Sequence, residues 1–309
     1  MSEMIPFPDK EAQLLASGTR KMLAQDYLSA KKDFEKLYNF APSFENVQQL
    51  IEVYRLLGDF EIAVFYAQEY EAEYLSNPDF FEQYIHLLLL DKQYLWVHRL
   101  LKKRPNEKLQ KDLIQLETTQ EFIAEYDLQL KEQLFAQWGQ QKQPIFGKKW
   151  ESWLKGLSLS RFIYLTKKYL PTIENPFLLP KVVEELVSCG VKETLSFKTI
   201  DGRLQAVDLS KILPLPQAPQ MVLFLELAAE AWENKDPQIA EGIAMEGQAH
   251  FSLLYPFLPE VSEIPRWIES YSLEYQSMFG NEKALESLKN YRNIQQTKQK
   301  LREIYQELM

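Results

Sequence analysis

The sequence predicts a mainly all-α protein, a solenoid of antiparallel helix pairs with one small β-hairpin in its C-terminal half. Three observations lead to this fold class. A pattern of aromatic and small residues recurs near the start of the chain with a period of about 34 residues, which is typical of arrays of helix pairs. Helical periodicity of apolar residues resumes beyond residue 148. Around Asp201-Gly202 the period of the apolar residues changes to that of strands.

The first repeat is expected over about residues 11–44. On its first helix, Gly18 has no side chain, so the two helices of the pair are expected to approach closely there. Pro42 is expected to end the second helix. The second helix carries an apolar stripe at helical spacing, formed by Tyr27, Ala30, Phe34 and Leu37.

The second and third repeats are expected over about residues 44–77 and 78–104. In the second, Gly58-Asp59 marks the turn between the helices. In the third, Pro105 stops the second helix. The inward positions of the two first helices are Val47, Leu50 and Tyr54, and then Phe81, Tyr84 and Leu88.

A long stretch without proline follows over residues 106–139 and is expected to extend the solenoid as a degenerate fourth repeat. Thr118 and Glu121 have the spacing of a capping box, which is expected to divide the stretch into two helices. Residues 139–147 are polar with a glycine at each end, so they predict a linker. Two domains follow: helical repeats over residues 1–138, and a helical domain over 148–309 that contains the hairpin at about 193–209.

The second domain contains clear start and stop signals. Asn175-Pro176 predicts a helix start, with asparagine as the cap and proline in the first turn. Asp201-Gly202 predicts a two-residue hairpin loop that pairs Phe197 with Ala206 and Thr199 with Leu204. The last helices are expected over residues 220–233, 237–254, 264–279 and 281–309.

The repeated positions of the first third resemble the tetratricopeptide repeat (TPR) family. That resemblance implies a right-handed TPR-like superhelix whose first helices line a concave groove that binds proteins. Two proline-containing stretches, 173–178 and 254–260, together with the hairpin, resemble an uncharacterised group of TPR proteins from low-GC Gram-positive bacteria (Bacillota). This second likeness extends over most of the chain, rests on structural motifs and implies no catalytic residues.

Mapping the family's inward positions onto this sequence gives a candidate partner-binding groove, formed by Gln48, Glu52, Arg55, Glu82 and His86. Some members of the family bind an acidic C-terminal tail through Lys, Asn and Arg, and those residue types are missing at or near the corresponding positions here. Because carboxylates repel an acidic tail, the groove is expected to prefer a neutral or basic protein or peptide.

Net charge, apolar stretches and cysteine number argue against several classes of partner and location. The formal net charge of −9 disfavours a nucleic-acid partner, because an acidic chain repels phosphates. No stretch approaches the roughly 18 apolar residues of a membrane span, and the N-terminus lacks the basic and apolar regions of a signal peptide. Cys189 is the only cysteine, so no intramolecular disulfide forms. We therefore expect a cytoplasmic protein without a membrane partner.

No motif for phosphate binding, metal binding or nucleophilic catalysis is present, so no catalytic residue, metal or cofactor is expected. Lysines alternate with aromatic residues over 148–168, and the aromatic residues are expected to fill a helical core while the lysines stay solvated. On the last helix, Lys298 occupies an a-like position of a short apolar seam, which predicts an amphipathic helix that covers the end of the solenoid.

Three functions remain open. The first is a non-catalytic scaffold or adaptor that binds a protein in the groove. The second is a peptide-responsive regulator, although no helix-turn-helix precedes the repeats. The third is an enzyme with a site near the hairpin, which no motif supports.

Overall fold

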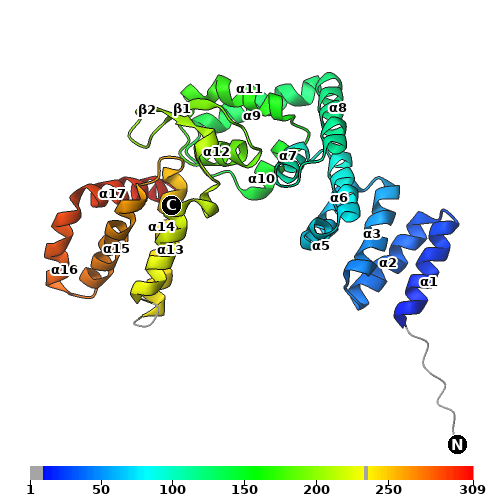
Figure 1. Cartoon of the computed structure of the whole chain (residues 1–309), viewed down its shortest axis with the longest axis horizontal. Coiled ribbons are helices and arrows are strands. Elements are labelled where there is room, and N and C mark those ends of the chain that lie inside the picture. Colours follow the sequence, from blue (N-terminus) through cyan, green and yellow to red (C-terminus); the bar gives the residue numbers. More distant parts are fainter. Residues whose placement is uncertain (1–9, 233–235, 309) are drawn as a thin grey trace, which may run out of the picture. The chain divides into compact units, whose positions relative to one another are not determined.

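The computed structural model describes residues 10–232 and 236–308. It is mainly α-helical with one two-stranded antiparallel hairpin, which confirms the predicted fold class (Figure 1). The chain divides into two compact units. The first runs to Ile123 and includes Leu154–Ser158, and the second contains Ala124–Trp153 and the chain from Leu159 onward. The predicted linker at 139–147 lies inside the second unit. The predicted features in residues 1–9, at Glu233 and at Met309 lie outside the described residues.

The first unit is a series of helix pairs at the predicted positions. Each first helix is followed by its partner after a short turn, and the second helix of the middle pair is split in two. The elements are α1 (Lys10–Leu23) and α2 (Tyr27–Phe40), then α3 (Phe44–Leu57), α4 (Phe60–Gln68) and α5 (Glu71–Ser76), then α6 (Pro78–Leu90) and α7 (Tyr94–Lys103), and finally α8 (Glu107–Ile123).

Local sequence signals set the helix ends in this unit. The Asp26 carboxylate accepts a hydrogen bond from the Ser29 N–H at the start of α2, and the Ser43 hydroxyl accepts one from the Asn46 N–H in α3. Asn77 caps α6, whose first residue is proline. Gly58 ends α3 with φ of 80°, a left-handed conformation that favours glycine.

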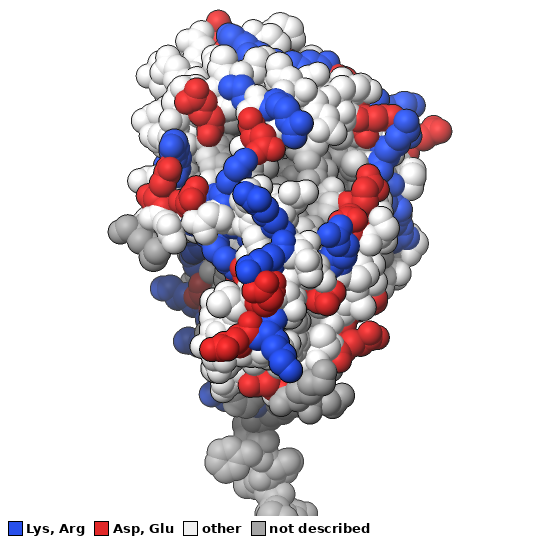
Figure 2. All heavy atoms as spheres, turned by 90° about the vertical axis from the view of Figure 1, so that its left-hand side faces the viewer, with Lys and Arg blue, Asp and Glu red and all other residues white. Residues whose placement is uncertain are grey.

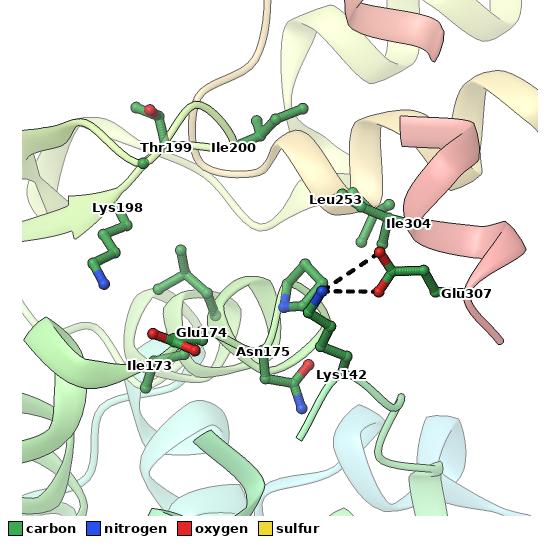
Figure 3. A pocket seen from close by; sticks show the side chains of 13 residues that line it. Lys142, Ile173, Glu174, Asn175, Lys198, Thr199, Ile200, Leu253, Ile304 and Glu307 are labelled. Carbon is green, nitrogen blue, oxygen red and sulfur yellow. Dashed lines mark hydrogen bonds and ion pairs between the residues drawn. The ribbon is translucent and has the colours of Figure 1, made fainter. Parts of the chain in front are cut away.

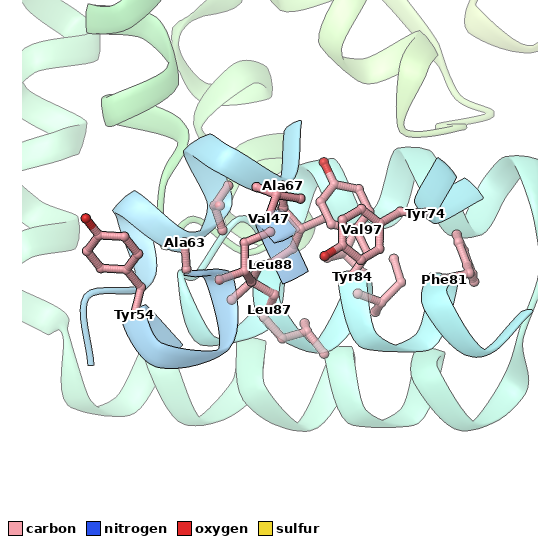
Figure 4. Packing of buried hydrophobic residues seen from close by; sticks show 14 of the residues in the cluster. Val47, Tyr54, Ala63, Ala67, Tyr74, Phe81, Tyr84, Leu87, Leu88 and Val97 are labelled. Atoms are coloured by element: carbon pink, nitrogen blue, oxygen red, sulfur yellow. The ribbon is translucent and has the colours of Figure 1, made fainter. Parts of the chain in front are cut away.

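The core of the first unit is a continuous layer of buried side chains between the paired helices. Figure 4 shows ten of them labelled, among them Val47, Tyr84 and Val97. Gly18 confirms the predicted close approach, because a Cβ built on it would lie 2.4 Å from the Phe34 ring. Within this unit α6 packs against α4, α5, α7 and α8.

The long stretch after α7 forms two helices as predicted, but the predicted capping box at Thr118 is wrong. The break falls at Ala124, between α8 and α9 (Glu125–Gln140). Thr118 lies inside α8 and its hydroxyl donates to the Ile114 carbonyl oxygen, 2.8 Å away. A threonine that bonds backward along its own helix does not cap a new one.

The second unit combines helices with the hairpin. After α9 it contains α10 (Gly147–Leu154), α11 (Leu159–Tyr169), η1 (Leu170–Thr172), α12 (Leu178–Ser188), β1 (Thr194–Lys198), β2 (Leu204–Asp208), η2 (Leu209–Lys211), η3 (Leu215–Gln217), α13 (Pro219–Trp232), α14 (Pro237–Leu254), η4 (Val261–Glu263), α15 (Ile264–Met278), α16 (Glu282–Ser287), η5 (Leu288–Tyr291) and α17 (Arg292–Gln306).

Part of the predicted linker is packed into this unit rather than solvated. Gly139 is buried in α9, and its carbonyl oxygen accepts hydrogen bonds from the N–H groups of Glu174 and Asn175. The Asn175 amide donates to the Trp138 and Gln143 carbonyl oxygens, while its own oxygen accepts from the Leu178 N–H at the start of α12. The helix itself begins at Leu178 with Phe177 as its N-cap, so the predicted cap at Asn175 and the predicted first-turn proline lie two residues too early, in the turn before α12. Asn175 instead holds that turn and ties it to the end of α9.

Three of the four aromatic residues of the 148–168 stretch lie in the core of the second unit, as predicted, whereas Tyr164 is 48% exposed. Trp150, Trp153 and Phe162 are buried, and the Trp153 ring stacks on Phe135 with ring centroids 5.0 Å apart. Lys148, Lys149, Lys167 and Lys168, on either side of them, are exposed as expected, whereas Lys155 and Arg161 are half-buried and paired with carboxylates. The alternation of basic and aromatic residues is therefore explained by helix packing.

The hairpin forms at the predicted turn, but its predicted register is wrong by one residue. Phe197 pairs with Gln205 and Lys198 with Leu204. The loop has three residues, because the Thr199 N–H donates a hydrogen bond to the Arg203 carbonyl oxygen. The Gly202 N–H donates another to the Thr199 carbonyl oxygen. Gly202 has φ of 77°, the left-handed residue that a three-residue loop requires. The longer loop moves every pair by one position.

Candidate binding groove and buried polar cluster

The five predicted groove residues lie on two neighbouring first helices, with Gln48, Glu52 and Arg55 on α3 and Glu82 and His86 on α6. Gln48 is half-buried. The Arg55 guanidinium donates to both carboxylate oxygens of Glu52 over 2.7 Å each, and that hydrogen bonding raises the pKa of Arg55. The charge of Glu52 is thus compensated on its own helix.

The two α6 residues face the next first helix, α8. Lys108 donates to Glu82 over 2.6 Å, and that hydrogen bond lowers the pKa of the Glu82 carboxyl. One turn further along, His86 Nε2 lies 3.9 Å from the Asp112 carboxylate. Because both glutamates have a cationic partner, the groove is less acidic than its sequence indicates.

Beyond these pairs, α6 and α8 enclose a hollow of about 560 Å³ together with the start of α7. His86 is the predicted groove residue that lines it, and the other four do not. Sequence reasoning did not select the remaining lining residues, which include Leu90, Lys92, Tyr94, Leu116, Gln120 and Ile123.

The hollow has a buried apolar floor and an exposed apolar rim. Leu89 and Tyr94 are 5% and 3% exposed, whereas Leu90 and Leu116 keep 43% and 39% of their surface accessible. Polar groups stand at its margin, with Gln120 almost fully buried. An apolar floor with a few polar groups around it is typical of binding sites. Leu116 and Ile123 are separated by seven residues, which is the signal for a shared helix face.

A segment from far along the chain supports one end of this hollow. The Gly156 N–H donates to the Lys92 carbonyl oxygen over 2.8 Å, and Lys155 forms an ion pair of 2.6 Å with Asp91, which is 4% exposed. The turn between α6 and α7 is therefore fixed by residues that the repeat pattern does not include.

The second unit contains a buried polar cluster on α14, α15 and α17. Lys298 is fully buried, forms an ion pair with Glu274, donates to the Ser270 hydroxyl over 2.8 Å, and lies 3.8 Å from the centre of the Tyr271 ring. Arg302 donates two hydrogen bonds to Glu274, of 3.1 and 2.8 Å. Two carboxylates, counting Glu246 beside Arg302, thus balance two cations.

Burial shifts the pKa values in this cluster. It lowers the pKa of Lys298 to about 8, against the opposing effect of Glu274. Next to it, His250 hydrogen-bonds with the Tyr271 hydroxyl, and burial lowers its pKa to about 4, helped by the charges of Arg302 and Lys298. The predicted a-like position of Lys298 thus holds a buried charge in a network that joins three helices.

Other reactive side chains are dispersed. His98 contacts Glu117 over 2.9 Å, and the buried Cys189 contacts Glu185. Within residues 10–232 and 236–308, no group of three or more His, Cys, Asp or Glu side chains is placed to hold a metal ion. In the same part of the chain, no helix is long and apolar enough to cross a membrane.

Comparisons of the chain with known proteins found no match. No protein-family model matches the chain, and searches of curated proteins and of solved structures found no significant match. The resemblance to the TPR family therefore stays a prediction from the repeated positions, and the function has to be argued from the groove itself.

Proposed function

We propose that the first unit is a non-catalytic protein-binding module of the TPR type, and that the hollow between α6 and α8 receives an apolar segment of its partner. The observation that supports this proposal is the exposed leucine rim over a buried floor. Covering the exposed part of Leu90 or Leu116 would contribute about 1 kcal/mol each. A few anchor residues that fill pockets carry most of the binding energy of protein interfaces.

The charges around the groove favour a neutral or basic partner. Glu52 and Glu82 are paired with Arg55 and Lys108, so those two cations are not available to an acidic tail. On the face drawn in Figure 2, basic and acidic side chains are interspersed and neither sign gathers into a patch. The net charge of −9 favours a protein over a nucleic acid. We place this activity in the cytoplasm on the evidence of the sequence.

The test is capture of partners from source-cell extract with the full chain and two matched variants. Leu116→Arg places a charge in the hollow. Ile114→Arg places the same charge on the same helix, at a residue that is 50% exposed and outside the hollow. We expect a partner that binds wild type and Ile114→Arg and is lost with Leu116→Arg. A partner retained equally by all three proteins would place the binding site elsewhere.

A further inference from the structure

The second unit has a hollow of its own, of about 270 Å³, that the proposed function does not use (Figure 3). Its walls come from the hairpin tip, the residues leading into α12, and the ends of α14 and α17. Its apolar surface is provided by Ile173 and Leu253, which are buried, and by the half-buried Leu179, Ile200 and Ile304.

These walls are held in place by polar contacts. Lys300 on α17 forms an ion pair of 2.6 Å with Asp201 in the hairpin loop. Lys142 and Glu307 form another, of 3.0 Å, at the right of Figure 3. The four hydrogen bonds of the Asn175 side chain fix the third wall. A hollow with fixed walls binds a ligand at a lower entropic cost.

Two charged side chains on this hollow have no partner among the described residues. They are Lys198 at the end of β1 and Glu174 before α12, and both lie on the side away from the Lys142–Glu307 pair (Figure 3). The other charged groups that line the hollow neutralise each other. The hollow thus offers one free cation and one free anion beside an apolar surface.

We propose that this hollow binds a small apolar zwitterion, a hydrophobic amino acid or dipeptide. Its carboxylate would contact Lys198, its ammonium group Glu174, and its aliphatic side chain Ile173, Leu253 and Ile304. A ligand with one charge would leave the opposite protein charge uncompensated. The volume lies just below the roughly 300–1,000 Å³ of most small-molecule sites, which limits the ligand to this size.

The test is calorimetric titration of the full chain with leucine and with the dipeptide Leu-Leu, which distinguishes the two sources of this chemistry. N-acetyl-leucine and leucinamide each lack one charge. We expect saturable binding of leucine or Leu-Leu, and affinity at least about tenfold lower for the single-charge analogues. Absence of saturable binding for both zwitterions, or equal affinity for an analogue, would overturn the proposal.

Variants locate the binding. Lys198→Ala and Glu174→Ala are each expected to lower the affinity for the zwitterion by about tenfold or more. Lys192→Ala and Glu260→Ala remove the same charges from exposed residues outside the hollow and are expected to bind as wild type does. Binding that survives in both hollow variants would contradict this assignment.

Discussion

Replacing Glu274 by glutamine removes the carboxylate that holds the buried cluster of the second unit together. Lys298 has no exposed surface and relies on Glu274 as its ion-pair partner, and Arg302 donates two hydrogen bonds to the same group. In Glu274→Gln both cations stay, but the charge between them is gone. Replacing Lys298 by methionine is the matched change, because Glu274 then keeps both bonds to Arg302.

The magnitudes follow from burial. Removing one partner of a buried ion pair costs about 3–5 kcal/mol, since the other charge is left unpaired in a medium of low polarity. Lys298→Met leaves no charge unpaired, because Glu274 keeps its two hydrogen bonds to Arg302, and it avoids the desolvation of the buried cation, so it should cost much less. We therefore expect Glu274→Gln to cost at least about 2 kcal/mol more than Lys298→Met. This difference is roughly a 30-fold change in the opening equilibrium.

Hydrogen exchange measured by mass spectrometry on peptides from α15 and α17 is the appropriate assay, because the protein has two compact units and global unfolding need not be two-state. Peptides of α3 serve as the internal control and should exchange as in wild type. If Lys298→Met speeds exchange in α15 and α17 as much as Glu274→Gln does, the lysine itself is stabilising and the reasoning from desolvation is refuted.

Three further predictions concern single residues. Gly18→Ala should destabilise the first unit by about 1–3 kcal/mol, because its Cβ would overlap the Phe34 ring. Urea denaturation tests this prediction. The control is Gly147→Ala, where an added Cβ meets only ordinary contact distances. His250 is held neutral when folded, so its contribution is present above its unfolded pKa of 6.5 and is lost as the pH falls towards 4. Stability should drop by about 2 kcal/mol between pH 7.5 and 5, and urea midpoints across this range should change less in His250→Gln. Thr166 is fully buried and its hydroxyl has no hydrogen-bond partner among the described residues. Thr166→Val should therefore raise the free energy of unfolding by about 1 kcal/mol, and with it the thermal midpoint. A lower midpoint would contradict this.

The candidate groove shows which features of a binding site can be predicted from a single sequence. The helices that would line it follow from the repeat period, and one of the five predicted groove residues, His86, lines the hollow. The sequence does not show that Lys108 on the next helix compensates Glu82, because no spacing rule connects those two residues. The seven-residue spacing of Leu116 and Ile123 indicates a shared face of α8, but periodicity alone does not say which apolar residues stay exposed.

Properties that depend on neighbouring residues were determined by the sequence alone. These are the helix pairs and their period, the close approach at Gly18 and the position of the hairpin, and each follows from backbone conformation or from side chains within a few turns. The tertiary structure decided the hairpin register, the partners of Lys298 and the two hollows. These features depend on residues that are distant along the chain and meet only after packing, where desolvation and shape select one arrangement among many that the local pattern permits.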